Sequence, residues 1–379
     1  MIEGRTIICF ACGYDAPPTS KHHVMHVLAE RNNVLWINYH ASRTPTASCS
    51  DLRHMTQKLR QVAGGLVCPR PNLHVLTPLV IPLPTSGWAR HLNRWLLIAQ
   101  IRRALKRLPR DPVQVWSFTP DIAYALGQFR EEKVVYYCVD DFAEFSGYDK
   151  GQVLRDEADL CRRADLVVTT SQALQDDKAP LNPNTVLVTH GVDYEHFARA
   201  VTGDLPMPTD MKAIPHPMLG FFGLIRDWVD VDLVAEVCRR HPDWHVVMIG
   251  DSTVDLAAYR GLPNLHFLGR KPYADLPAYC RCFDVGLIPF KVNELTRAVN
   301  PIKLREYIAA GLPVVSTPMP EVVTCGGNVR LGAGLGDFIA AAEAAVADAA
   351  TGDRTARSAM MANETWAAKV NRICQGLSA

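Results

Sequence analysis

The sequence predicts an α/β fold of two domains, each a parallel sheet covered by helices. Apolar runs of strand length alternate with helical patterns along most of the 379 residues, and this alternation is typical of parallel sheets. It stops once, in the proline-containing stretch Ala198–Pro217, and then restarts. A chain of this length is also expected to bury more than one hydrophobic core.

The first series of elements begins near the N-terminus. Thr6–Cys12 is an apolar strand, and a loop rich in Gly and Pro leads to the helix Lys21–Arg31. The later strands of this series are Val34–Tyr39, Val113–Ser117, Lys133–Cys138, Leu166–Thr170 and Thr185–Val188. We expect these elements to form an N-terminal domain over residues 1–197, followed by a linker over 198–217.

The second series follows the linker and is expected to form a domain over residues 218–353. Its strands are Met218–Phe222, His245–Ile249, Leu265–Leu268, Val285–Pro289 and one that begins at Val314. Its helices are Val231–Arg240, Leu276–Cys282, one after Pro301, and Asp337–Ala350. A last helical segment, Arg354–Leu377, belongs to a C-terminal stretch over residues 354–379.

Composition excludes several classes of protein. Hydrophobic residues make up 48% and charged residues 21%, with a net charge of +1, which is typical of a globular protein with no affinity for nucleic acid. No apolar run is long enough to span a membrane. The N-terminus lacks the layout of a signal peptide, and the eleven cysteines lack the spacing of a disulfide framework. These features favour reduced thiols in a cytoplasmic protein.

The stretch Asn300–Thr317 is the most informative part of the chain. Asn300 is expected to cap a helix that begins at Pro301 and ends at Gly311. Lys303 falls in the first turn, where the helix dipole attracts anions, so a lysine there indicates a bound phosphate. Glu306 lies one turn later on the same face, where it could hold a sugar diol. The alternative is an ordinary surface pair of Lys303 and Glu306.

Four loops of the second series follow strands, and such loops meet at one edge of a parallel sheet. Gly223 permits close backbone approach, and Arg226 in the same loop can reach a phosphate. Gly250 and Arg270 lie in the next two loops, and residues 290–300 lead into the Lys303 helix. We therefore expect a ligand site built from Gly223, Arg226, Gly250, Arg270, Asn300, Lys303 and Glu306.

No metal or other cofactor is expected. Asp230 and Asp232 flank Val231 at the start of a helix, where carboxylates cap the helix and complement its dipole. The close cysteine pairs Cys9/Cys12 and Cys280/Cys282 lack a second cluster to complete a zinc site.

Two adjacent carboxylates follow the strand Lys133–Cys138. Asp140 and Asp141 could each be a helix cap, an ion-pair partner or a general base. Successive side chains of a strand point to opposite sides, so one of the two is expected to act as a base.

Residues near the first helix and near the linker are further candidates. Lys21, His22 and His23 open the first helix, and they either begin it or contact phosphate or acceptor. His190 follows a strand near the linker, where a cap or hinge role is favoured over catalysis.

A basic segment lies in the first domain. Eleven Lys or Arg and no Asp or Glu occur between Arg53 and Arg110. If residues 88–110 form one helix, Trp88 and Trp95 share a face with Arg102, Arg103, Lys106 and Arg107. Aromatic residues beside basic ones are typical of a helix that lies on an anionic membrane. The alternative is a solvated basic helix with a partly buried Trp pair.

The pattern Pro301-x-Lys303-x-x-Glu306-Tyr307-x-Ala309-x-Gly311-x-Pro313-Val314-Val315 resembles the signature of bacterial glycosyltransferases of family four. The resemblance implies the GT-B fold, two Rossmann-like βαβ domains facing a central cleft. It implies in addition that the C-terminal helix within residues 354–379 crosses back to the N-terminal domain. It also implies that Lys303 contacts the donor diphosphate and Glu306 the ribose or sugar hydroxyls. The loop that contains Arg270 resembles the one that holds the nucleobase. Retaining members carry a second glutamate eight positions earlier, where this chain has Ala298.

The run from Tyr136 to Phe142 and the motif His190-Gly191-Val192-Asp193 resemble the glycosyltransferases that assemble xanthan and teichuronic acid. This resemblance selects Asp140 as the base. It implies metal-independent, inverting transfer of a sugar from a nucleotide donor, UDP-linked, to a lipid-linked glycan. Such an enzyme lies on the inner face of the cytoplasmic membrane. Two alternatives remain: a nucleotide-sugar 2-epimerase of the same fold, and a degenerate, membrane-bound partner protein.

Overall fold

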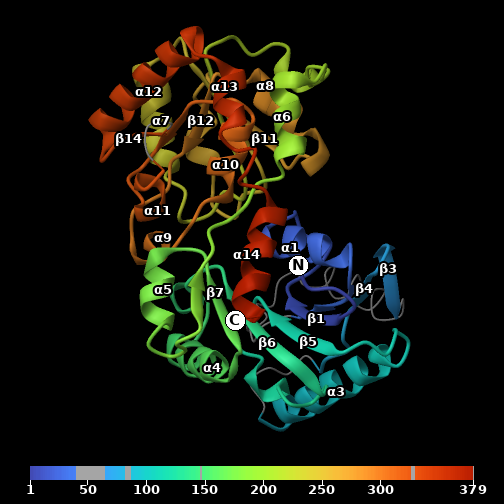
Figure 1. The fold of residues 1–379 in the computed structure, drawn as a ribbon. Coiled ribbons are helices and arrows are strands. Elements are labelled where there is room, and N and C mark those ends of the chain that lie inside the picture. The colour runs from blue at the N-terminus through green and yellow to red at the C-terminus, as the bar shows by residue number, and fades with distance from the viewer. Residues whose placement is uncertain (40–64, 82–86, 146, 326–328, 379) are drawn as a thin grey trace. The chain divides into compact units, whose positions relative to one another are not determined.

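The computed structural model describes residues 1–39, 65–81, 87–145, 147–325 and 329–378 (Figure 1). The chain divides into two compact units, one of Met1–Thr189 with Lys369–Ala379 and one of His190–Ala368. The basic residues Arg53, Lys58 and Arg60 lie outside the described residues.

The first unit contains a sheet of eight strands in the order β3-β4-β2-β1-β5-β6-β7-β8. Every neighbouring pair is parallel except β3 and β4. The strands are β1 (Thr6–Ala11), β2 (Asn33–Asn38), β3 (Leu66–Arg70), β4 (Leu73–Leu76), β5 (Val113–Ser117), β6 (Glu131–Cys138), β7 (Leu166–Thr169) and β8 (Thr185–Leu187). The fold prediction is confirmed, although β3 and β4 were not expected.

The helices of the first unit are α1 (Ser20–Ala29), α3 (Gly87–Leu105), α4 (Lys150–Arg163) and α5 (Gln172–Lys178). In the basic segment, α3 is a single helix, as expected, although it ends before Arg110. It buries Leu97 and Ile101 and leaves Trp88 and Trp95 exposed. Among the described residues, no helix is long and apolar enough to cross a membrane.

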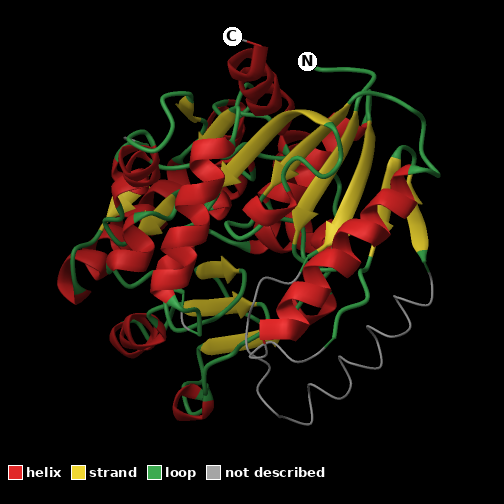
Figure 2. Cartoon of the chain, turned by 90° about the horizontal axis from the view of Figure 1, so that it is seen from below, coloured by secondary structure: helices red, strands yellow, loops and turns green. Residues whose placement is uncertain are grey.

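The second unit contains a six-stranded parallel sheet in the order β11-β10-β9-β12-β13-β14. The strands are β9 (Met218–Phe222), β10 (His245–Ile249), β11 (Leu265–Gly269), β12 (Val285–Ile288), β13 (Val314–Ser316) and β14 (Val329–Leu331). Its helices are α6 (Tyr194–Thr202), α7 (Val231–Arg240), α8 (Leu276–Cys282), α9 (Glu294–Arg297), α10 (Ile302–Ala309), α11 (Pro320–Val323), α12 (Leu335–Thr351) and α13 (Arg354–Ala359). Helices flank the strands in each unit (Figure 2).

Two boundaries differ from the expected ones. The predicted linker begins inside α6, which buries Phe197 and Ala198 and packs against α8 and α10. The last helical segment is also two helices, α13 and α14 (Trp366–Ser378). They are separated because Glu364 accepts a hydrogen bond from the backbone of Val192 (2.9 Å), and Thr365 pairs with Val192 in a β-bridge.

Candidate active site

Three loops at the carboxyl ends of neighbouring strands form a backbone surface in the second unit. The amide of Gly223 donates to the carbonyl of Ile249, and the amide of Gly250 donates to that of Gly269, both at 2.9 Å. Gly223 and Gly250 have φ values of +136° and +146°, which favour glycine. A Cβ atom on Gly250 would stand 1.9 Å from the carbonyl oxygen of Gly223. The loops therefore present backbone rather than side chains to a ligand.

Gly250→Ala is expected to destabilise the protein by more than about 1 kcal/mol, because the new methyl group meets both a positive φ and the Gly223 carbonyl. Urea unfolding of the variant measures this loss. Gly261→Ala is the matched control, because Gly261 has open space around its Cβ position. Equal stability of the two variants would contradict the described loop packing.

Lys303 points from α10 toward these glycine loops. Its Nζ lies 4.7 Å from the ring centre of Phe290 and 5.4 Å from that of Phe221, both within cation–π range. A Cβ atom on Gly223 would lie 3.2 Å from the Cε of Lys303. Burial lowers the pKa of Lys303 to about 8, against the opposing effect of Glu306. An anion bound at the loops would favour the charged lysine.

Glu306 is the second ionisable group of α10 at this site, with 7% of its surface exposed. Burial raises the pKa of Glu306 to about 8; the charge of Asp193 adds to this rise, and Lys303 opposes it. Within the described parts of the chain, neither Lys303 nor Glu306 forms an ion pair or a side-chain hydrogen bond. The surface-pair alternative is therefore wrong, and both groups remain available to a ligand.

The predicted role of Asn300 as the helix cap is wrong. The helix begins at Ile302, and Pro301 occupies the cap position. The buried side chain of Asn300 instead accepts a hydrogen bond from Arg305 (2.7 Å) and donates one to Glu321 (3.0 Å). Its amide has both a donor and an acceptor, so it braces the loop that leads into α10. Gly311 follows the last helical turn with φ +76°, as expected for a C-terminal stop.

The two predicted arginines lie in different surroundings. Arg226 stacks on Trp228, with its guanidinium carbon 4.9 Å from the ring centre. Its Nε is buried and has no hydrogen-bond partner among the described residues. Arg270 is exposed in the loop after β11. Of the two arginines, Arg226 is therefore the one that is partly buried and has a hydrogen-bond donor that is free within the described chain.

Of the two carboxylates at the start of α7, Asp230 caps the helix, as predicted, and Asp232 lies in its first turn. Asp230 accepts a hydrogen bond from the amide of Leu233 (2.9 Å), and Asp232 accepts one from the hydroxyl of Tyr259 (2.7 Å). In the regions that the structure describes, no group of three or more His, Cys, Asp or Glu side chains could hold a metal ion. The ten cysteines in these regions are free thiols, and Cys12 is exposed.

Asp140 and Asp141 follow β6 in the first unit and have different partners. Asp141 caps the short 3-10 turn Phe142–Glu144 by accepting a hydrogen bond from Ala143 (3.1 Å). The carboxylate of Asp140 accepts no hydrogen bond from any described residue. Burial raises the pKa of Asp140 to about 7; Lys21 opposes this rise, and Asp141 adds to it. Asp140 therefore has the freedom and the pKa range of a general base.

The residues at the start of α1 divide into two groups. His22 is buried: its Nδ1 accepts from the amide of Thr19 and its Nε2 donates to the carbonyl of Tyr14, both at 3.1 Å. Burial lowers the pKa of His22 to about 4, so the ring is neutral. Both ring nitrogens hold the chain that precedes the helix, which favours the helix-start role of His22 over contact with a ligand. Lys21 and His23 are partly exposed, and Lys21 donates to the Sγ of Cys12.

Residues around the motif that begins at His190 include one that sequence reasoning missed. His190 is buried with its ring 5.8 Å from that of Trp366. Asp193 occupies the cap position of α6 but makes no cap hydrogen bond, and its charge acts on Glu306 and on Tyr273. No sequence pattern predicts that proximity, because Asp193 lies far from Tyr273 and Glu306 in the sequence.

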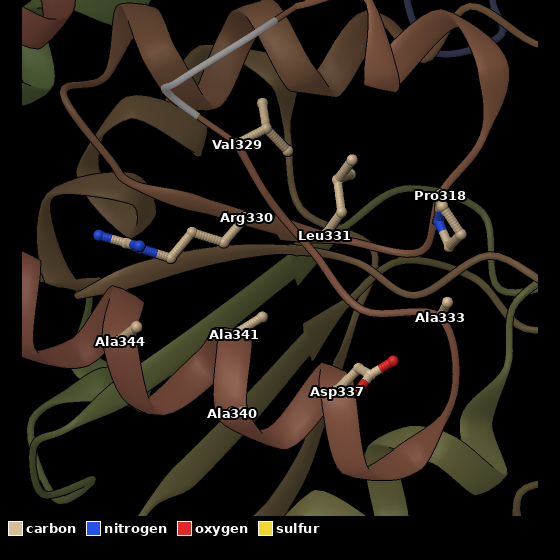
Figure 3. A pocket seen from close by; sticks show the side chains of 9 residues that line it. All are labelled: Pro318, Val329, Arg330, Leu331, Ala333, Asp337, Ala340, Ala341 and Ala344. Carbon is tan, nitrogen blue, oxygen red and sulfur yellow. The ribbon is translucent and has the colours of Figure 1, made fainter.

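A shallow depression of about 610 Å³ lies elsewhere in the second unit (Figure 3). Pro318 after β13, residues 329–331 of β14 and the alanines of α12 line it, with Asp337 at one end. None of the predicted site residues is among these lining residues.

Part of the second unit matches a known family of proteins. Residues 217–351 match the family described as "Glycosyl transferases group 1". The putative teichuronic acid biosynthesis glycosyltransferase TuaH of Bacillus subtilis (strain 168) is 28% identical over 223 residues. That alignment covers 55% of this chain and 56% of TuaH, so the match spans about half of each protein.

Solved structures match over almost the whole chain. Anabaena HepE in complex with UDP and glucose is 16% identical, with a TM-score of 0.65 over 98% of this chain and 99% of HepE. Sucrose-phosphate synthase from Thermosynechococcus elongatus is 13% identical, with a TM-score of 0.69 over 98% of both chains. These matches confirm the GT-B fold that the resemblance implied.

Proposed function

We propose that this chain, which carries a glycosyl transferases group 1 domain on a GT-B fold, transfers a sugar from a UDP-linked donor to a lipid-linked glycan. The observation that carries the proposal is the position of Lys303 beside the glycine loops, with the buried Glu306 one turn away. An ammonium group next to backbone amides suits a diphosphate, and a carboxylate suits a ribose or sugar diol. The UDP and glucose in the similar HepE structure favour a UDP-linked sugar.

In the proposed reaction, Asp140 accepts the proton of an acceptor hydroxyl while its oxygen bonds to the anomeric carbon of the donor sugar. The bond between that carbon and the diphosphate oxygen breaks, and UDP leaves with the electron pair. Lys303, Arg226 and the N-terminus of α10 stabilise the charge on the leaving diphosphate. A single displacement inverts the anomeric centre, which agrees with Ala298 at the position of the second glutamate of retaining enzymes.

The pH profile of kcat/KM is expected to rise with pH, with its half-maximal value at about 7. Asp140 acts as a base only when deprotonated, and burial has raised its pKa to about 7. Activity is therefore present above this pH and lost as the pH falls through it. Initial rates at low acceptor concentration measure the profile. An unchanged rate from about pH 5 to pH 8 would contradict the role of Asp140.

Turnover is expected to continue in EDTA. Lys303 and Arg226 supply positive charge beside the loops that we assign to the diphosphate, a task that a divalent ion performs in other enzymes. Loss of activity in EDTA, with recovery on addition of magnesium or manganese, would overturn this proposal of metal independence.

We further propose that the acceptor is a lipid-linked precursor of an exopolysaccharide or another surface polysaccharide. The protein then works on the inner face of the cytoplasmic membrane as a peripheral protein. The teichuronic acid pathway named for TuaH supports this acceptor class, and the exposed Trp88 and Trp95 beside basic residues support contact with a membrane.

A thermal-shift screen of nucleotide sugars tests the proposed function, because a ligand that binds the folded protein raises its apparent stability. UDP-sugars are expected to raise the melting temperature more than GDP- or ADP-sugars. A 2-epimerase would convert the donor without an acceptor, and a degenerate partner protein would neither bind nor convert it. The absence of a shift with any nucleotide sugar would contradict the proposal.

A further inference from the structure

The outward face of α3 carries large apolar side chains. Trp88 and Trp95 are 62% and 63% exposed, and Leu92 between them is also exposed. Residues three and four apart lie on the same side of a helix, so the three side chains form one row. The opposite side holds Leu97 and Ile101 in the core. Two tryptophans exposed in one row are unusual on a protein surface without a partner.

A second chain segment extends this row. Leu79 and Val80, which follow β4, are 48% and 47% exposed. Asn93 and Gln100 bind the backbone on either side of Val80 to α3. Asn93 accepts from the amide of Ile81 (2.7 Å) and donates to its carbonyl (2.9 Å); Gln100 accepts from the amide of Leu79 (2.8 Å) and donates to its carbonyl (3.1 Å).

These two amide clamps fix where the second segment lies. Asn93 and Gln100 are seven residues apart and so occupy one flank of α3, two turns from each other. Because each clamp uses both a donor and an acceptor, the segment Leu79–Ile81 is held along that flank. The exposed side chains of Leu79 and Val80 are thereby kept beside the Trp88–Leu92–Trp95 row.

The C-terminal end of α3 and the turn that follows it are cationic. Arg103, Lys106 and Arg107 are exposed, and they form no ion pair within the described parts of the chain. Arg102 differs, because its guanidinium donates to the carbonyl and side chain of Gln128, both at 2.9 Å. The sequence from Arg53 to Arg110 contains no acidic residue to offset these charges.

We propose that α3 and Leu79–Ile81 form one surface that binds an anionic lipid membrane. Leu79, Val80, Trp88, Leu92 and Trp95 enter the interface between head groups and acyl chains, and Arg103, Lys106 and Arg107 bind lipid phosphates. The apolar row explains insertion, and the unpaired cations explain selectivity for anionic lipid. The inference rests on the proposed function, because a lipid-linked acceptor lies at such a membrane. It adds the residues through which the protein contacts that membrane.

Co-sedimentation with vesicles tests this surface. Wild-type protein is expected to bind phosphatidylglycerol-containing vesicles more tightly than pure phosphatidylcholine vesicles. Each basic residue near an anionic surface contributes a factor of about five to partitioning, so Arg103→Gln/Lys106→Gln/Arg107→Gln should lose on the order of 100-fold. Salt at about 1 M, where the screening length is about 3 Å, should remove the same contribution.

The apolar row is tested by two double variants. Trp88→Ser/Trp95→Ser is expected to weaken binding at least about tenfold on both kinds of vesicle, and Leu79→Ser/Val80→Ser several-fold. Leu154→Ser/Met360→Ser is the matched control, because these side chains are 46% and 52% exposed on other elements. It should bind vesicles as the wild type does.

Two results would overturn the proposal. One is unchanged vesicle binding by the Trp double variant. The other is a wild-type protein that binds no vesicles but self-associates in a concentration-dependent way, with the self-association abolished in the Trp double variant. The face would then join two copies of the chain. The thermal shift with UDP-sugars should be the same in all these variants. If wild-type protein showed no thermal shift with UDP-sugars but still bound vesicles, the proposed function would be refuted and the membrane-binding surface would still be supported.

Discussion

Replacing Asp140 with Asn is expected to reduce sugar transfer by about 10²–10⁴-fold, the usual effect of removing a general base. The substituted amide keeps the size of the side chain but cannot accept the proton. Because Glu306, Lys303 and the glycine loops belong to the second unit, the affinity for the donor should stay nearly the same. Transfer rates and donor titrations on one preparation measure both quantities.

Asp141→Asn is the matched control. Asp141 already accepts a hydrogen bond from Ala143, so its replacement should affect the 3-10 turn far more than the chemistry. An inactive Asp141 variant beside an active Asp140 variant would mean that the other carboxylate is the base. Full activity in both variants would place the base elsewhere, or indicate retention, which NMR of the product's anomeric configuration would reveal.

Replacing Lys303 or Glu306 with Ala is expected to weaken donor binding about ten- to a hundredfold. Each variant removes a charge-assisted hydrogen bond, which contributes roughly 1.5–3 kcal/mol. Lys303→Ala should weaken UDP and UDP-sugar binding alike, because the lysine acts on the diphosphate. Glu306→Ala removes contacts to hydroxyl groups of the ribose or of the donor sugar. Equal loss of affinity for UDP and UDP-sugar would indicate the ribose, and loss of affinity for UDP-sugar alone would indicate the donor sugar. Isothermal titration calorimetry measures these affinities.

Lys212→Ala provides the control for charge, because Lys212 is an exposed lysine of the same unit. It should bind the donor with wild-type affinity. Wild-type affinity in folded Lys303 and Glu306 variants would show that the donor binds elsewhere.

Much of the fold could be predicted because parallel strands covered on both sides are continuous apolar runs. The strands Val113–Ser117, Met218–Phe222 and His245–Ile249 and the helix Val231–Arg240 have the expected bounds. The short edge strands β3 and β14 escaped prediction because most of their residues are exposed and their sequences are mixed. The break between α13 and α14 depends on pairing with Val192, a contact that no local pattern contains.

Part of the candidate site could also be predicted from the sequence, and part could not. Lys303 and Glu306 lie on a helix that follows a strand of the sheet. Both elements could be recognised from the local sequence, so the positions of these two residues could be predicted. The phenylalanine rings under Lys303 and the approach of Asp193 to Glu306 come from separate parts of the chain, so the sequence did not predict them. His22 and Asn300 were candidates for contact with a ligand. In the structure their side chains bond buried backbone and side-chain groups, and no local sequence pattern predicts these contacts.

The most direct test of the central claim, transfer of a sugar from a UDP-linked donor to a lipid-linked glycan, follows radiolabelled sugar into lipid. The protein is incubated with labelled UDP-sugars and a bacterial lipid extract, and label is counted in the organic phase. We predict that wild-type protein moves label from one UDP-sugar into lipid and that Asp140→Asn does not. Conversion of the UDP-sugar without an acceptor, and with no label in the lipid, would contradict the account.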